Sequence, residues 1–187
     1  MLRLVEPERL VAITGFTSAS HPDGWRFGER PSVGRSRDVE AVLRLRPDLV
    51  VASKFAEESW LTRLREEDIA VFDLGEMRGV DTTRANIRAL AALLDVPERG
   101  RKLEEDYARN LRALDLAIPD EAMPPGLYLS IYGDELFGGT AGTSYEDLLR
   151  YGGITDLAPT RGYSGWPNYS QEAVVELDPA LVVTQEN

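Results

Sequence analysis

The spacing of apolar and polar positions predicts strands and helices in alternation along the first part of the chain. Residues 10–14 (LVAIT) and 70–74 (AVFDL) are short apolar runs, and residues 49–52 are apolar and largely β-branched, as buried strands are. Residues 39–46 and 57–65, which lie between these apolar runs, have the spacing of apolar positions that is typical of helices. This β-α-β-α-β order is typical of a parallel sheet covered by helices.

One pattern occurs twice in the chain. Residues 40–51 read EAVLRLRPDLVV and residues 172–183 read EAVVELDPALVV, with eight of the twelve positions identical. Each copy predicts a short amphipathic helix that begins with Glu, ends before Pro and is followed by a buried strand. The repeat therefore predicts two similar α/β lobes, and the cleft between two such lobes is a usual place for a ligand.

The middle of the chain has a different, purely helical pattern. Residues 81–94 and 98–116 both have helical periodicity, and Pro97 suits the first position of the second helix. At 1.5 Å per residue this second helix would be roughly 30 Å long, enough to connect two lobes. We therefore expect an N-terminal α/β lobe, a connecting backbone helix and a C-terminal α/β lobe at residues 1–96, 97–118 and 119–187.

The second half begins with a predicted strand at residues 127–132 and ends with another at residues 181–184. Ser144 is a candidate cap for a helix that extends to residue 151, and Ser170 for the helix of the second repeat. Residues 133–142 and 159–169 are expected to be irregular, as are residues 15–34 near the start.

These three irregular segments, or the positions beside them, carry aromatic and cationic side chains. Binding residues are often placed on such loops, and aromatic rings with arginine suit a bulky, partly anionic, planar or macrocyclic ligand. The candidate ligand-binding residues are His21, Trp25, Arg26, Tyr132, Phe137, Arg161 and Trp166.

Composition narrows the possible partners. The net charge is −11 and the pI is about 4.6, which disfavours binding to nucleic acid or to an anionic membrane. No apolar run is long enough to span a bilayer, and the first residues lack the pattern of a signal peptide. The chain has no cysteine and one histidine, so we expect no thiolate catalysis and no multi-histidine metal site. No resident cofactor is expected.

The opening glutamates of the repeat, Glu40 and Glu172, have two explanations. An acidic side chain in the first turn stabilises a helix by about 0.3–1 kcal/mol through the helix dipole. Alternatively, the pair lies on equivalent surfaces of two lobes and docks a two-fold partner that presents arginines.

An enzyme is the alternative from another class. Asp134 or Glu135 with His21 would suit a hydrolase if the groups converged within hydrogen-bond reach. The glycine-rich run at residues 138–142 lacks the lysine and the spacing of phosphate-binding loops, so a nucleotide site is not expected.

Taken together, these motifs resemble the class III, helical-backbone substrate-binding proteins of ABC importers for iron–siderophores, haem and vitamin B12. The resemblance rests on His-Pro at 21–22, SVG at 32–34, EAVLRLRPDLVVAS, YGDELFGGTAGTSYEDLLRYGG and WPNYSQEAVVELDPALVV. It covers nearly the whole chain.

The resemblance implies two α/β lobes joined by one long helix, with a metal chelate bound between them and no catalytic step. An iron–siderophore is the preferred ligand, with corrinoid or haem as the alternatives. It also implies that Glu40 and Glu172 dock the dimeric ABC permease, that Trp166 faces the ligand and that the loop of His21 faces the cleft.

Members of the family begin with a strand and helix ahead of this chain and continue beyond its last strand. We therefore expect a fragment or a reduced relative whose second lobe is incomplete. A truncated relative without a transport role is a further alternative. By resemblance, the location is periplasmic or that of an extracellular lipoprotein.

Overall fold

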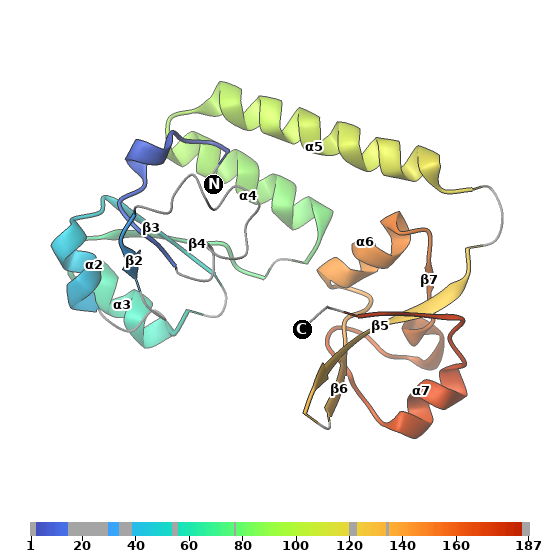
Figure 1. Ribbon diagram of the computed structural model, residues 1–187. Coiled ribbons are helices and arrows are strands. Elements are labelled where there is room, and N and C mark those ends of the chain that lie inside the picture. Colours follow the sequence, from blue (N-terminus) through green and yellow to red (C-terminus); the bar gives the residue numbers. More distant parts are fainter. Residues whose placement is uncertain are drawn as a thin grey trace. The chain divides into compact units, whose positions relative to one another are not determined.

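Two long helices, α4 (Val80–Leu93) and α5 (Pro97–Ala117), each contribute residues to two structural units (Figure 1). The computed structural model describes residues 3–14, 30–33, 39–53, 56–76, 78–119, 123–133 and 135–184. The first unit comprises Met1–Glu76 and Leu90–Gly100, and the second comprises Met77–Ala89 and Arg101–Asn187. Both helices were expected from their periodicity, and α5 begins at Pro97 as predicted.

The first unit is built from short parallel strands and two helices. In chain order its elements are η1 (Pro7–Arg9), β1 (Ile13–Thr14), β2 (Ser32–Val33), α2 (Val39–Leu45), β3 (Leu49–Ala52), α3 (Glu58–Glu66) and β4 (Ala70–Asp73). Strand β1 pairs in parallel with β2, and β3 pairs in parallel with β4. A buried cluster that includes Val42, Trp60, Leu61 and Leu64 joins α2 and α3 to these strands, so the expected α/β class is confirmed here.

The second unit holds a mixed sheet. Its elements are β5 (Pro125–Tyr132), β6 (Glu135–Gly138), α6 (Ser144–Tyr151), β7 (Thr155–Asp156), η3 (Ala158–Arg161), β8 (Asn168–Tyr169), α7 (Gln171–Leu177) and β9 (Leu181–Val183). The central strand β5 is parallel to β7 and β9 and antiparallel to β6, which in turn pairs with β8. The sheet is therefore mixed, whereas the sequence indicated parallel strands alone.

Part of the segment expected to be a glycine-rich loop is a strand. Residues 135–138 form β6. Its last residue is a glycine because the ring of Tyr169 lies directly against the backbone at this position. A Cβ atom added to Gly138 would lie 2.2 Å from a ring carbon of Tyr169. Glycine in a strand often marks such a close approach, and here it conceals the strand from pattern analysis.

Two further local predictions need correction. The segment expected to be irregular at residues 159–169 includes part of η3 and all of β8. The N-cap of α6 is Thr143, whose hydroxyl accepts a hydrogen bond from the Tyr145 N–H at 3.2 Å, and Ser144 is the first helical residue. Ser170 caps α7 as predicted, accepting from the Ala173 N–H at 3.1 Å.

The two copies of the repeat fold alike. Each forms a seven-residue helix followed by a strand, α2 with β3 and α7 with β9. Arg46 and Asp178, each directly before a proline, adopt left-handed backbone conformations with φ of 47° and 48°. Because this conformation is unfavourable for residues with a Cβ, its occurrence at both positions shows that the repeat is structural as well as sequential.

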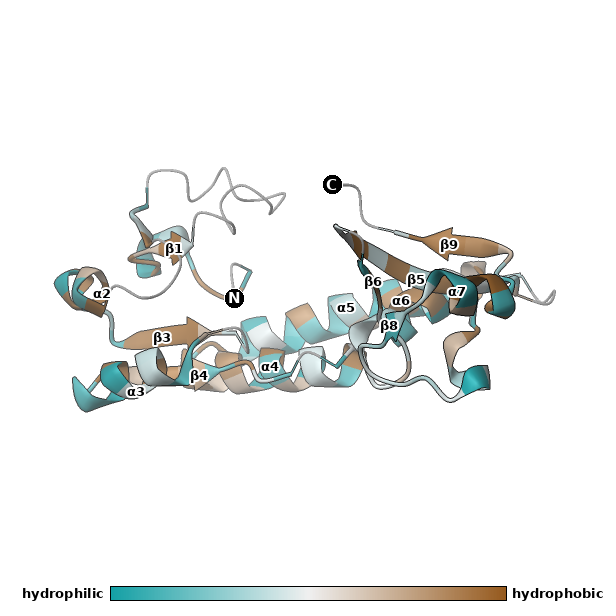
Figure 2. Ribbon diagram, turned by 90° about the horizontal axis from the view of Figure 1, so that it is seen from below, coloured by the Kyte–Doolittle hydropathy of each residue, from teal (hydrophilic) through white to brown (hydrophobic). Residues whose placement is uncertain are grey.

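Hydropathy varies among the elements (Figure 2). The strands β3 and β9 are apolar, whereas α5 carries mixed charged and apolar positions along its length. Among the helices in the described ranges, none combines the length and the apolar character needed to cross a membrane.

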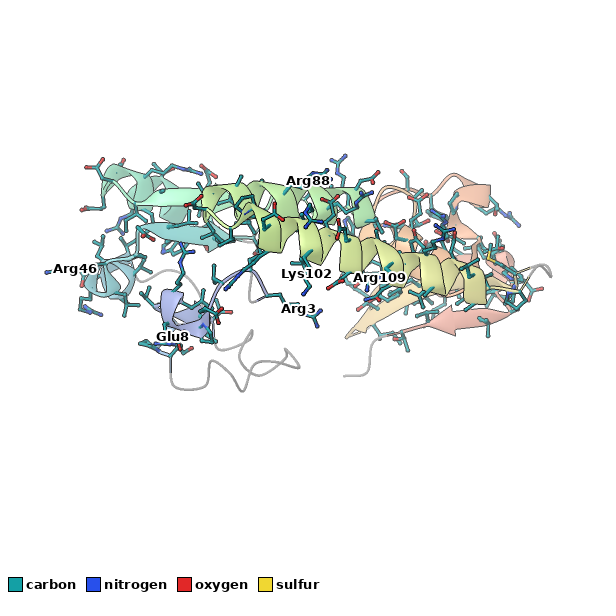
Figure 3. The ribbon with its side chains drawn as sticks, turned by 90° about the horizontal axis from the view of Figure 1, so that it is seen from above. Arg3, Glu8, Arg46, Arg88, Lys102 and Arg109 are labelled. Carbon is teal, nitrogen blue, oxygen red and sulfur yellow. The ribbon has the colours of Figure 1, made fainter. Side chains whose placement is uncertain are left out.

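A carboxylate on α5 joins α5 to α4 within the second unit. Glu104 on α5 accepts a hydrogen bond from the Arg84 guanidinium at 2.9 Å and also pairs with Arg88, which is labelled in Figure 3. The Glu104 side chain is only 16% exposed, so this ion-pair network is partly shielded from water.

Candidate functional site

Three aromatic side chains of the second unit contact one another in sequence and are called here the aromatic cluster. Tyr128 on β5 and Tyr145 on α6 stack with ring centroids 3.7 Å apart, and the Tyr128 hydroxyl donates to the Tyr145 hydroxyl at 3.1 Å. Trp166 meets Tyr145 edge to face, with centroids 5.3 Å apart and an interplanar angle of 83°. Tyr128 is buried, whereas Trp166 is 57% exposed. The cluster thus presents an indole ring to solvent on a buried aromatic base, an arrangement suited to stacking with a flat ligand.

Backbone hydrogen bonds hold the segment that carries Trp166. Gly138 N–H donates to the Pro167 carbonyl at 2.7 Å, and Thr140 N–H donates to the Gly165 carbonyl at 3.1 Å. In return, Gly165 N–H donates to the Ala141 carbonyl at 2.9 Å. The residues on both sides of Trp166 are therefore tied to the segment after β6, so the indole is mounted on an ordered backbone before any ligand arrives.

The glycine-rich run at residues 138–142 serves packing at this site. A Cβ atom added to Gly139 would lie 2.5 Å from a ring carbon of Tyr145, so the Tyr145 ring rests against bare backbone. The next residue, Thr140, is fully buried and its hydroxyl bonds the Asp156 carboxylate. The other carboxylate oxygen of Asp156 accepts from the Ala158 N–H at 3.0 Å. These contacts give Gly139 and Thr140 a role in packing at this site.

Two phenols of the second unit, Tyr128 of the cluster and Tyr169 beside Gly138, have raised pKa values. Burial, helped by the hydrogen bond to Tyr145, raises the pKa of Tyr128 to about 12. Burial also raises the pKa of Tyr169 to about 12, with the nearby Asp156 charge adding to the effect. Both phenols therefore remain protonated, and recognition by the cluster would rest on ring faces and hydroxyl groups.

The structure places the predicted ligand residues unequally. His21, Trp25 and Arg26 lie outside the described residues, as does the side chain of Tyr132. Phe137 is half-buried on β6, in register with Ser130 and Asn168. Arg161 is exposed in η3, and its guanidinium donates to the Glu176 carbonyl at 3.3 Å.

Among the predicted ligand-binding residues that the structure describes, Trp166 is the one that belongs to the aromatic cluster. Its partners Tyr128 and Tyr145 were not predicted as site residues. The available signal was weak: Tyr128 alternates within an apolar strand, and Tyr145 follows the glycine-rich run at the start of a helix.

The two candidate docking residues are exposed, one in each unit. Glu40 lies in the first turn of α2 and Glu172 in the first turn of α7. The pKa of Glu172 is lowered by a hydrogen bond from its own backbone N–H and then by the Ser170 side chain, so its carboxylate is charged at neutral pH. Their role in docking stays a prediction.

The residues of the enzyme alternative are only partly described. Glu135 is exposed on β6, whereas His21 and Asp134 lie outside the described residues. Within the described ranges, no three His, Cys, Asp or Glu side chains gather in a group that could hold a metal ion.

Comparison with known proteins places the chain among binding proteins. The family model described as periplasmic binding protein matches residues 9–187. A curated relative, a cobalamin-binding protein of Halobacterium salinarum, is 26% identical over 203 aligned positions, covering 96% of this chain and 54% of the relative. The chain thus spans about half the length of the curated relatives it matches.

Solved structures agree with the family match. A periplasmic heme-binding protein from Pseudomonas aeruginosa superposes with a TM-score of 0.81 and 27% identity, covering 98% of this chain and 66% of that one. A possible iron-binding, periplasmic solute-binding protein from Staphylococcus epidermidis has a TM-score of 0.83 at 16% identity, covering 97% and 70%, which shows the shared fold.

The family and the heme-binding neighbour are binding proteins rather than enzymes, which confirms the expectation of a non-enzyme. Because the family model covers nearly the whole sequence, from residue 9 to residue 187, the chain belongs to the periplasmic binding protein family.

Proposed function

We propose that this protein is the solute-binding component of an ABC importer and captures a metal chelate for delivery to the permease. The observation that carries the proposal is the Trp166 indole, exposed on a backbone-bonded segment and supported by Tyr145. The family match and the fold shared with solved solute-binding proteins support it.

The proposed ligand is a cobalamin-type corrinoid, with haem and ferric siderophores as the alternatives. The described part of the site consists of neutral aromatic side chains, which suit a large, largely uncharged macrocycle. An anionic siderophore would instead call for cationic groups, and the aromatic cluster contains none. Ferrichrome, in which three hydroxamates balance the charge of Fe³⁺, is the neutral siderophore for comparison. The names of the curated relative and of the Pseudomonas structure favour cobalamin and haem.

We further propose that Glu40 and Glu172 dock arginines of a permease dimer. Both carboxylates are exposed, and they open the two copies of a repeat that folds alike in both units. Such a protein would work on the outer side of the cytoplasmic membrane, in a periplasm or at a cell surface.

Isothermal titration calorimetry with cyanocobalamin, haemin and ferrichrome tests the ligand proposal. We expect the protein to bind cyanocobalamin with a Kd of about 1 μM or tighter, equivalent to roughly −8 kcal/mol. Trp166→Ala should weaken this binding by about tenfold, because an aromatic anchor is lost.

Leu116→Ala is the matched control, because Leu116 on α5 is also exposed and apolar but lies outside the cluster. It should bind as the wild type does. Tighter binding of haemin or ferrichrome would transfer the proposal to that ligand. Absence of binding to all three, or full affinity in Trp166→Ala, would refute it.

A further inference from the structure

We infer that Tyr145 is a positioning residue, which governs ligand affinity by fixing the orientation of the Trp166 indole. The predicted effect on ligand affinity rests on the proposed function, whereas the predicted effect on the orientation of the Trp166 indole can be tested without a ligand. Tyr145 is assigned this role because its ring lies between the buried Tyr128 ring and the exposed Trp166 indole.

Tyr145 itself is held from several directions. Tyr128 stacks on its ring at 3.7 Å between centroids and donates a hydrogen bond to its hydroxyl. The backbone of Gly139 closes another side, where even one added carbon would come within 2.5 Å of the ring. Its own N–H is bonded to the Thr143 hydroxyl at the start of α6. Its ring is therefore a fixed surface against which another ring can rest.

Trp166, in contrast, is fixed at its backbone but largely open at its side chain. The hydrogen bonds of Gly165 and of the Pro167 carbonyl restrain the chain on both sides, yet the indole is 57% exposed. Exposed side chains exchange rotamers on the picosecond to nanosecond timescale unless a neighbour restrains them. The edge-to-face contact with Tyr145 supplies such a restraint, so it selects the rotamer that a ligand meets.

The test compares Tyr145→Leu, which removes the ring, with Tyr145→Phe, which keeps it. The first readout needs no ligand and consists of the fluorescence anisotropy and the acrylamide quenching of Trp166. The Trp166 signal is isolated by subtracting the fluorescence of the same variant that also carries Trp166→Phe. The second readout is the Kd for cyanocobalamin by calorimetry. Tyr151→Leu is the matched control, because it removes a tyrosine ring six positions along the same helix, about 9 Å away.

Tyr145→Leu should lower the anisotropy of Trp166, increase its quenching and weaken cyanocobalamin binding by about fivefold, the scale of one aromatic pair. Tyr145→Phe should stay within about twofold of the wild type in both readouts, and Tyr151→Leu should match the wild type. If Tyr145→Leu does not fold by circular dichroism, Gly139→Ala takes its place, since the added methyl group displaces the Tyr145 ring.

The two proposals fail in different ways. Unchanged anisotropy and quenching of Trp166 in Tyr145→Leu would overturn the positioning role, whatever the affinity. Absence of binding by the wild-type protein would overturn the proposed function, while the ligand-free comparison would still decide the role of Tyr145.

Discussion

At the scale of single residues, the second unit keeps two phenols in environments that oppose their ionisation. Burial raises the pKa of Tyr128 and of Tyr169 to about 12, above the usual value of 10.0 for a tyrosine. Tyr128 belongs to the aromatic cluster, and Tyr169 covers Gly138 on β6. The same packing that supports the site therefore makes folding sensitive to high pH.

The stability of the protein should fall as the pH rises from about 10 to about 12. In this window the unfolded chain releases phenolic protons that folded Tyr128 and Tyr169 retain, so unfolding is favoured, whereas below pH 10 the contribution is fully present. Urea midpoints measured at a series of pH values report this loss. The double variant Tyr128→Phe with Tyr169→Phe should lose less stability across the window, and equal slopes in both proteins would contradict the assignment.

Single residues also mark the limit of the sequence analysis. Trp166 was found because a tryptophan in an irregular, aromatic-rich segment is conspicuous, and Ser170 because a hydroxyl before an amphipathic run is a usual cap. Tyr145 could not be found in this way. Its role depends on stacking with a ring of β5, 17 residues earlier in the chain, and on the absence of a side chain at Gly139.

At the scale of elements, the sequence pattern predicted the long helices and the apolar strands β3, β4, β5 and β9, but it missed β6 and β8. The helices α4 and α5 each have several turns in which the apolar spacing repeats, and Pro97 marks the start of the second. The strands β6 and β8 are only a few residues long, so their structure depends on pairing, of β6 with β5 and of β8 with β6. That pairing is a tertiary contact, which local pattern does not contain.

Glu104 illustrates an element-scale contact whose strength comes from partial burial. Glu104→Gln should lower the free energy of unfolding by about 1–2 kcal/mol, because Arg84 and Arg88 lose a shared, shielded carboxylate. Urea unfolding followed by circular dichroism measures the change.

The matched control for this change is the next residue of α5. Glu105→Gln breaks an exposed pair with Arg101 and should cost less than about 0.5 kcal/mol. Equal costs for the two variants would show that the shielding of Glu104 contributes nothing.

At the scale of the whole molecule, the duplicated motif gives each unit one exposed glutamate on an acidic protein. The net charge of −11 provides a general attraction to a basic partner, so a docking experiment must separate specific contacts from this background. The α/β class and the family could be predicted from the motifs, because these extend over most of the chain and the family match does too. The ligand could not, because aromatic rings and arginine suit several macrocycles and chelates, and the geometry that selects among them is set by tertiary structure.

Glu40→Arg or Glu172→Arg alone should weaken binding to the cognate ABC permease in detergent or nanodiscs, and both together should abolish it. Each reversal replaces an attractive contact with arginine by a repulsive one. Surface plasmon resonance at two salt concentrations measures the affinity.

The double variant Glu66→Arg with Glu105→Arg changes the net charge equally, with one exposed residue in each unit. It should lose only the salt-dependent part of the affinity. If it weakens binding as much as the docking pair does, bulk charge rather than docking by Glu40 and Glu172 explains the interaction.

The backbone hydrogen bonds that hold the segment around Trp166 have an evolutionary consequence. They join Gly138, Thr140 and Gly165 to carbonyl groups of the main chain, so they place no demand on the identity of residue 166. Substitutions at this position can therefore be sampled without loss of the segment that presents it. If Trp166 contacts the ligand as proposed, this separation of scaffold from recognition would let ligand preference change through a few substitutions at and around residue 166.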